Sequence, residues 1–201
     1  MEYRAHVYRS LQLESLLEDM IRFFRQSPLA PLGNICEATF TGVGAYALYY
    51  AGDLPVYAGH PADRSIYVGK AAPRGWRHGR QLKEIGPNLY LRLCEHARSI
   101  EATSDLRVDD FMCRFVILED AAIDLVAALE SALIRLFLPL WNSVVDGFGI
   151  HHPGSGRYGQ APSEWDTLHP GRTWLKHLTG QARQRAEIIA KIREHIAQLG
   201  V

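Results

Sequence analysis

Two short aromatic stretches, AYALYY at residues 45–50 and SIYVG at residues 65–69, determine the fold that we predict for this chain. Tyrosine and aliphatic side chains dominate both stretches, and such residues favour short β-strands. The segment between them, residues 52–64, contains two prolines and two glycines and is predicted to be an excursion between the two strands. A third strand is predicted at residues 111–118, FMCRFVIL.

The rest of the chain is predicted to consist of helices and loops around this small sheet. Apolar residues at helical spacing, with Ser27 and Pro28 or Pro139 as breakers, define the longer helices. Asn88 and Ser163 are placed to cap helices. The helices are predicted over residues 11–26, 88–100, 123–137 and 181–199, with a short one after Ser163. Loops are predicted over residues 28–41 and 142–159, and a loop or an irregular helix over residues 71–87. The chain is therefore predicted to be a mixed α/β protein.

The composition is that of one folded domain, predicted over residues 1–201. The 201 residues include 22 Lys and Arg against 22 Asp and Glu, and 47% are hydrophobic. No apolar run reaches the roughly 18 residues of a membrane span, and the polar N-terminus carries no secretory signal. The three cysteines form no CxxC pair, so reduced thiols in a cytoplasm are expected. Basic segments at residues 70–98 and 172–193 flank an acidic one at residues 101–130, which indicates either solvated surfaces or a basic face for a partner.

Some apparent motifs do not carry the chemistry that they suggest. GVGAYA at residues 42–47 matches a dinucleotide-binding pattern, but such a pattern must open a helix, and here a strand is predicted. Gly69 and Lys70 lack the Ser or Thr and the first glycine of a phosphate-binding P-loop. His151 and His152 are adjacent, and adjacent residues rarely bind one metal ion together. These residues are interpreted as turn glycines and loop histidines.

Glu130, Arg92 and His96 are the candidates for chemistry that the residues themselves provide. Glu130 has apolar neighbours three and four residues away on its predicted helix, where a carboxylate is costly unless it is paired or binds a cation. A buried salt bridge, with Arg135 or Arg92, and a metal site are both open. Arg92 and His96 are four residues apart and point the same way, either as a solvated basic face or as a phosphate clamp beside a proton acceptor.

Taken together and in this order, these residues resemble the GIY-YIG nuclease superfamily. Gly44-Ala45-Tyr46 stands for the first motif, with Ala45 at the usual aliphatic position, and Tyr67-Val68-Gly69 for the second, with Val68 for Ile. The resemblance continues through Arg92, His96, Glu130 and Asn142 and covers about residues 42–145. It implies a small three-stranded antiparallel sheet flanked by helices, an N-terminal helix at 11–26 and a C-terminal extension at 146–201. The flanks, LWNSVVDGFG at 140–149 and residues 163–172, look like type II restriction endonucleases that cut CCGCGG.

The resemblance implies hydrolysis of a DNA phosphodiester with one Mg²⁺ or Mn²⁺ ion. Tyr46 is expected to activate the water, and His96 is expected to take the proton of the Tyr46 hydroxyl. Arg92 is expected to hold the phosphate and Glu130 to be the protein's metal ligand. The remaining expected roles are positioning of phosphate or water by Tyr67 and Asn142, phosphate contact by Lys70, and base reading by Arg74, Arg77, Arg80, Arg157 and Gln160.

The implied partners follow from a palindromic target. Double-stranded DNA is the expected substrate, and two copies of the chain are expected to form a homodimer on it, since each carries one site. A cognate DNA methyltransferase in the same bacterial restriction system, outside any complex, is also implied, and no membrane is. The alternatives are a monomeric nicking, repair or homing-type nuclease of the same superfamily, and a catalytically silent DNA-binding protein on the same fold.

Overall fold

The computed structural model describes residues 3–73, 85–152 and 154–199. Its helices are α1 (Leu11–Gln26), α2 (Leu32–Ile35), α3 (Asn88–Glu101), α4 (Val126–Phe137), α5 (Leu140–Ser143), α6 (Glu164–Leu168) and α7 (Arg185–Leu199). Its strands are β1 (Leu29–Pro31), β2 (Val43–Tyr50), β3 (Ser65–Ala71) and β4 (Phe111–Leu118). Short 3₁₀ turns at Tyr3–His6, Pro55–Tyr57, Val108–Asp110, Asp120–Leu125, Ser155–Arg157 and Thr173–His177 complete the described elements.

The strands form one antiparallel sheet in the order β1-β4-β2-β3. The three predicted strands are confirmed, and β1 is a fourth strand at residues predicted to be a loop. A strand of three residues gives no clear period in the sequence, and β1 exists because Leu29–Pro31 pairs with Met112–Arg114 of β4. The mixed α/β class is confirmed.

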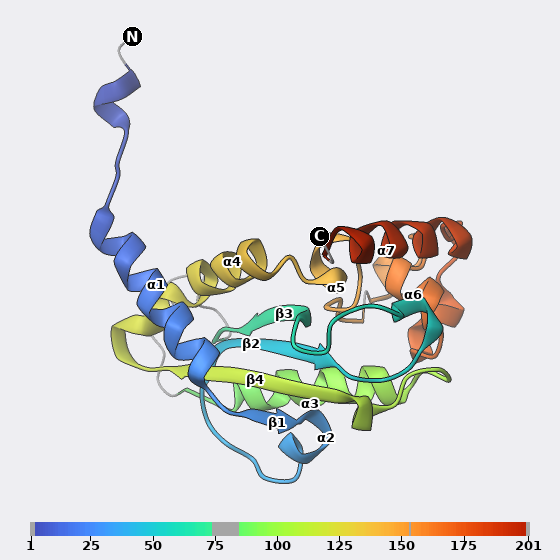
Figure 1. Ribbon diagram of the computed structural model, residues 1–201. Coiled ribbons are helices and arrows are strands. Elements are labelled where there is room, and N and C mark those ends of the chain that lie inside the picture. The colour runs from blue at the N-terminus through green and yellow to red at the C-terminus, as the bar shows by residue number, and fades with distance from the viewer. Residues whose placement is uncertain (1–2, 74–84, 153, 200–201) are drawn as a thin grey trace.

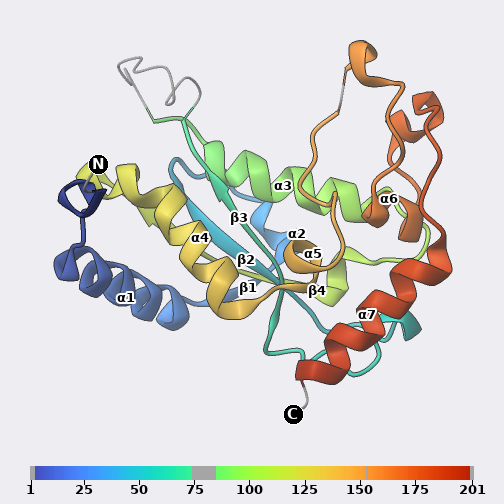
Figure 2. The same cartoon turned by 90° about the horizontal axis from the view of Figure 1, so that it is seen from above.

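Helices cover both faces of this sheet, so the central strand β2 is buried along its whole length (Figures 1 and 2). Ala45, Ala47 and Tyr49 face the apolar cluster under α1 and α4. The alternate residues, Tyr46 and Leu48 among them, face a second apolar cluster with α3, α5, α6 and α7. The strand alternation therefore divides the side chains between two cores.

Several predicted boundaries shift in the structure. Asn88 is the first residue of α3 rather than its cap, because Pro87 occupies the capping position and offers no side-chain bond. A 3₁₀ turn precedes α4, so the predicted helix over 123–137 begins at Val126, and α7 begins at Arg185 rather than at 181. The predicted loop over 142–159 includes the end of α5 and one 3₁₀ turn. Ser163 does cap α6, where its Oγ accepts a hydrogen bond from the backbone N–H of Asp166 at 3.1 Å.

The expectation of three reduced thiols is wrong for two of them. Cys36, at the end of α2, and Cys94, on α3, form a disulfide across a Cα–Cα distance of 5.6 Å. Their separation of 58 residues hides the pairing, which becomes visible only when α2 packs on α3. Cys113 of β4 is a buried free thiol, and its burial raises its pKa to about 12.

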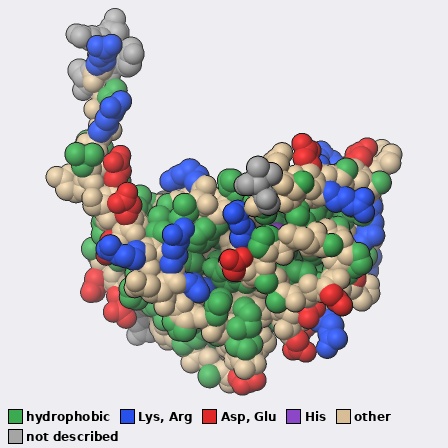
Figure 3. Space-filling view, viewed as in Figure 1, with side chains coloured by type: hydrophobic (Ala, Val, Ile, Leu, Met, Phe, Trp, Pro, Cys, Tyr) green, Lys and Arg blue, Asp and Glu red, His purple; other side chains and the backbone are tan. Residues whose placement is uncertain are grey.

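The N-terminal end of α1 projects away from the rest of the molecule (Figures 1 and 3). Apolar side chains on this projection are exposed, with Tyr8 at 84% and Leu11 at 77%. Phe24, at the other end of the helix, is fully buried against the sheet. Among the described residues, no helix has both the length and the apolar character to cross a lipid bilayer.

Candidate active site

Tyr46 and His96 form the buried centre of the site. The Oη atom of Tyr46, on β2, lies 2.6 Å from Nε2 of His96, on α3, and both side chains are buried. Burial raises the pKa of Tyr46 well above its usual value and lowers the pKa of His96 well below its usual value. Both groups are therefore neutral at pH 7, and a neutral imidazole nitrogen can accept the phenolic proton.

Gly69 is required for this arrangement. It pairs with Tyr46 across the β2–β3 ladder, and a Cβ atom at Gly69 would lie 2.4 Å from the Tyr46 hydroxyl oxygen. Any side chain there would displace the hydroxyl from His96. The lack of space beside the Tyr46 hydroxyl therefore explains why the second motif has a glycine at this position.

Tyr67 and Arg92 line the opening above this pair. The Tyr67 ring lies 5.2 Å from the His96 ring, and burial raises the pKa of Tyr67, which also stays neutral. Arg92 donates to the carbonyl of Gly149 at 2.6 Å and to Oε2 of Glu95 at 2.8 Å. Arg92 and His96 lie one helical turn apart on the same side of α3, as their spacing predicted.

Glu130 pairs with Lys70, and not with Arg92 or Arg135. Glu130 projects from α4 and Lys70 from β3, and both side chains are largely buried. The predicted partners were the wrong ones because no helical spacing reveals a contact with a strand 60 residues away. A lone carboxylate of this kind fits Mg²⁺, which binds few protein groups and keeps several of its waters.

These side chains line one cavity of about 760 Å³. The predicted residues on its wall are Tyr46, Tyr67, Lys70, Arg92 and Glu130. His96 lies behind Tyr46 and is one of the residues around the adjoining cavity of about 490 Å³. The structure thus brings together, from two strands and two helices, residues that the sequence holds in four separate segments.

Asn142 lies beside this cavity rather than on its wall. Its Nδ2 donates to the carbonyl of Val68 at 2.9 Å, and its Oδ1 accepts from the N–H of Val68 at 2.7 Å. The amide thus satisfies both backbone groups of a residue on the outer edge of β3, as a neighbouring strand would. Asn142 therefore fixes the strand that carries Tyr67 and Gly69.

Sequence analysis missed Glu95, Gly149 and His151 on the cavity wall. His151 was interpreted as a loop histidine, yet its Nδ1 lies 3.2 Å from Nη1 of Arg92. Its doublet with His152 signals no metal site: the described residues contain no group of three or more His, Cys, Asp or Glu side chains that could hold an ion. No spacing rule would have linked Gly149 or His151 to α3, because the loop after α5 has no period.

The predicted base-reading residues lie away from this cavity or outside the described part of the chain. Arg74, Arg77 and Arg80 belong to residues 74–84, which lie outside the described residues. Arg157 and Gln160 are exposed in the loop between α5 and α6, which projects from the molecule in Figure 2. Their predicted contact with DNA stays a prediction.

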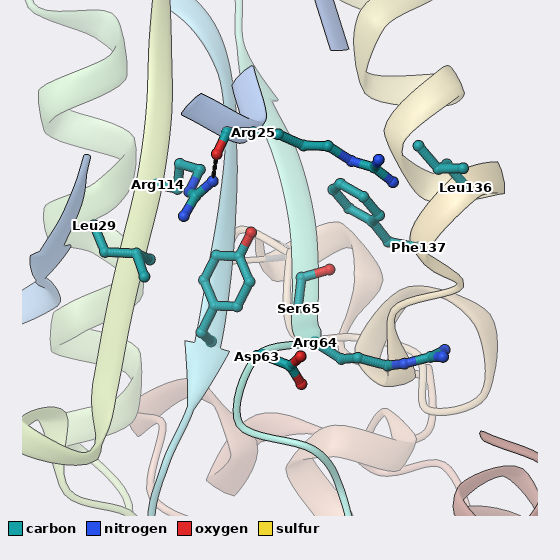
Figure 4. Close-up of a pocket in the computed structure, with 9 residues that line it drawn as sticks. Arg25, Leu29, Asp63, Arg64, Ser65, Arg114, Leu136 and Phe137 are labelled. Carbon is teal, nitrogen blue, oxygen red and sulfur yellow. Dashed lines mark hydrogen bonds between the residues drawn. The ribbon is translucent and has the colours of Figure 1, made fainter. Parts of the chain in front are cut away.

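A further cavity, of about 390 Å³, lies on the α1 and α4 side of the sheet (Figure 4). It contains Arg25, Arg64 and Arg114, and two of these arginines have structural partners there. Arg114 donates to the carbonyl of Arg25 near the end of α1, and the Arg25 guanidinium lies 5.6 Å from the ring centroid of Phe137. Among the described residues that line this cavity there is no histidine, and the one carboxylate is that of Asp63. The cavity with Tyr46 is therefore the better candidate for catalysis.

Comparison with protein families identifies the domain that carries this cavity. A family model described as the Eco29kI GIY-YIG domain matches residues 38–196. The chain belongs to this family. The match indicates a GIY-YIG nuclease domain of the restriction endonuclease type, which implies DNA as the substrate. It also extends beyond the predicted core at 42–145 and includes most of the C-terminal segment. A search of curated proteins found no match.

Proposed function

We propose that this Eco29kI-family chain is a type II restriction endonuclease that hydrolyses double-stranded DNA at a GC-rich palindrome, CCGCGG. The products are 5′-phosphate and 3′-hydroxyl ends, and the chain acts as a homodimer because one palindrome needs two cuts. The observation that supports this proposal best is the 2.6 Å contact between Tyr46 and His96 beside Arg92 and Glu130. This set contains a proton relay, an anion clamp and a carboxylate in one cavity.

Tyr46 transfers protons in this proposal without becoming a free phenolate. Its raised pKa disfavours a lasting negative charge, so its hydroxyl takes a proton from the attacking water as it passes its own to Nε2 of His96. His96 alone is a poor acceptor because burial and the charge of Arg92 lower its pKa. A phosphate bound to Arg92 neutralises that charge, so the substrate itself makes His96 more basic.

Arg92 and Glu130 support the phosphate and the leaving group. The Arg92 guanidinium binds non-bridging phosphate oxygens through two N–H donors, which keeps the phosphorus in line with the water. Glu130 would hold a Mg²⁺ or Mn²⁺ ion, whose chemistry when bound is to stabilise the developing charge on the leaving 3′-oxygen. Lys70, which pairs with Glu130 in the structure, would be free to contact the phosphate if Glu130 held the ion.

Cleavage of a plasmid with one CCGCGG site tests the proposal. We expect linear product with Mg²⁺ and none with EDTA, with both ends mapped inside the site by run-off sequencing. A plasmid with one base pair of the site changed is the matched control. Cuts elsewhere would retain the nuclease and reject the target sequence, while intact DNA under all conditions would favour the silent DNA-binding alternative.

A further inference from the structure

Residues 147–150 pack against the side chains of the candidate active site and cover His96. The Phe148 ring stacks on the His96 ring, with centroids 4.5 Å apart and planes 19° apart. Gly149 accepts the 2.6 Å hydrogen bond from Arg92, and a Cβ atom at Gly149 would lie 2.3 Å from the Tyr67 hydroxyl oxygen. One short segment thus contacts His96, Arg92 and Tyr67 together.

Arg172 holds this segment through hydrogen bonds to its backbone. Its guanidinium donates to the carbonyl of Gly147 at 2.9 Å and to the carbonyl of Phe148 at 3.1 Å. A longer contact of 3.4 Å reaches the carbonyl of Ile150. The carbonyls of Gly147, Phe148 and Ile150 therefore share one side-chain donor, and the planar fork of an arginine offers several N–H groups in a fixed arrangement.

Arg172 is itself fixed and buried. Its side chain is 3% exposed, Nε donates to Oδ1 of Asp166 at 2.6 Å, and Ser163 donates to the other carboxylate oxygen at 2.8 Å. Its guanidinium carbon lies 4.5 and 4.9 Å from the ring centroids of Trp165 and Trp174. A cation so enclosed cannot reach a DNA phosphate, and its bonds offset the cost of its burial.

We propose that Arg172 is a positioning residue for cleavage: it sets the 147–150 segment, which in turn orients Arg92 and keeps water from His96. The expected effect of Arg172 on the cleavage rate rests on the proposed nuclease function. Its expected effect on His96 rests on geometry alone. The groups that face His96 are Tyr46 of β2, Tyr67 of β3, Arg92 of α3, His151 and Arg172. Of these, Arg172 hydrogen-bonds the backbone of Phe148, and the Tyr67 ring also packs against the Phe148 ring.

Arg172→Lys tests this role because it keeps the positive charge and removes the fork. We expect cleavage in a single turnover to slow by about tenfold or more, since small misplacements of catalytic groups have large effects on rate, while DNA affinity stays within about twofold. Arg183→Lys is the matched control, because Arg183 pairs with the neighbouring Glu164 and contacts none of residues 147–150. Lys191 also pairs with Glu164, so the control should behave as wild type.

A second readout needs no cleavage. NMR titration of ¹³C-labelled histidine, with the His96 signal assigned from a His96→Gln variant, follows the pKa of His96 directly. We expect that pKa to rise toward its usual value in Arg172→Lys and in Phe148→Leu, because both loosen the cover and admit water. Thermal unfolding and near-UV circular dichroism select variants that keep the native fold.

The outcomes separate the two proposals. If the wild-type protein cuts no DNA, the proposed function fails, and the His96 titration still tests the cover. If the wild type cuts while folded Arg172→Lys has an unchanged rate and an unchanged His96 pKa, the positioning role is overturned. Equal losses in Arg172→Lys and Arg183→Lys would overturn it as well, since a general loss of stability would then explain both.

Discussion

At the scale of single residues, the site contains titratable side chains that burial keeps neutral. Tyr46, Tyr67 and His96 are buried together and neutral, while Arg92 and Glu130 bring charge to the edge of the same cavity. This separation suits a reaction that moves protons through the interior and binds an anion at the mouth. Two substitutions follow from it.

Tyr46→Phe removes the hydroxyl and retains the ring. We expect cleavage to fall by roughly 10²–10⁴-fold, the usual contribution of a positioned acid or base. The free energy of unfolding should fall by about 1–3 kcal/mol, because Nε2 of His96 loses its buried partner. Single-turnover cleavage and urea unfolding measure the two effects. Tyr90→Phe, on α3 away from the cavity, is the matched control, and equal cleavage by both variants would contradict the relay.

Glu130→Gln keeps the shape of the side chain and removes its charge. Cleavage should be abolished and DNA binding largely kept, because the amide is a poor ligand for Mg²⁺ and the phosphate contacts remain. Gel-shift and cleavage assays on the same DNA measure both properties. The exposed Glu101→Gln serves as control. A Glu130→Gln enzyme that cuts at the normal rate would show that the metal role was assigned to the wrong residue.

At the scale of elements, the outer edge of β3 is held by a side chain rather than by a strand. Asn142→Asp keeps the acceptor for the Val68 N–H and loses the donor to the Val68 carbonyl. We expect a loss of about 1–3 kcal/mol in stability, because a carboxylate now faces a carbonyl, and slower cleavage. Hydrogen exchange at the Val68 amide measures the loosening. Exchange no faster than in Asn34→Asp, an exposed control on α2, would count against this role.

The α2–α3 disulfide gives a second prediction at this scale. Denatured, unreduced protein should release one reactive thiol per chain, that of Cys113, because Cys36 and Cys94 are joined. Native protein should react slowly, since Cys113 is buried and its pKa is about 12. Titration with a thiol reagent measures both values. Three thiols in the denatured chain would restore the expectation of reduced cysteines.

The sequence predicted the elements with strong local patterns and missed those that depend on distant contacts. The strand at 111–118 and the helix at 11–26 have the predicted bounds because their apolar periods are clear. Strand β1, the Cys36–Cys94 pair and the Lys70–Glu130 pair appear only once separate segments meet. Motif order placed most of the cavity residues, whereas Gly149 and Arg172 sit in aperiodic loops and needed the structure.

At the scale of the whole molecule, one buried and two partly buried histidines make stability depend on pH. Burial lowers the pKa of His96 and His195, and that of His60 to about 4. These groups take up protons in the unfolded chain near pH 6.5 but not in the native one. Acid therefore stabilises the unfolded state relative to the native state, and the free energy of unfolding should fall as pH drops below about 6.5.

Thermal unfolding between pH 8 and pH 5 checks this expectation. The double substitution His60→Gln and His195→Gln should flatten part of the slope, because it removes two of the groups that titrate only on unfolding. The exposed His177→Gln is the control, since the structure gives it no buried environment. A midpoint that stays constant or rises on acidification would contradict the prediction.

The two cores on opposite faces of the sheet have a consequence for how the protein acquires activity. The core side under α3 contains Tyr46, Tyr67 and His96. The α4 side of the sheet contains Lys70 and Glu130. Neither half of the cavity can work without the other, so activity reports the joint formation of both cores. Cleavage activity should therefore appear together with the native fold, in one cooperative transition.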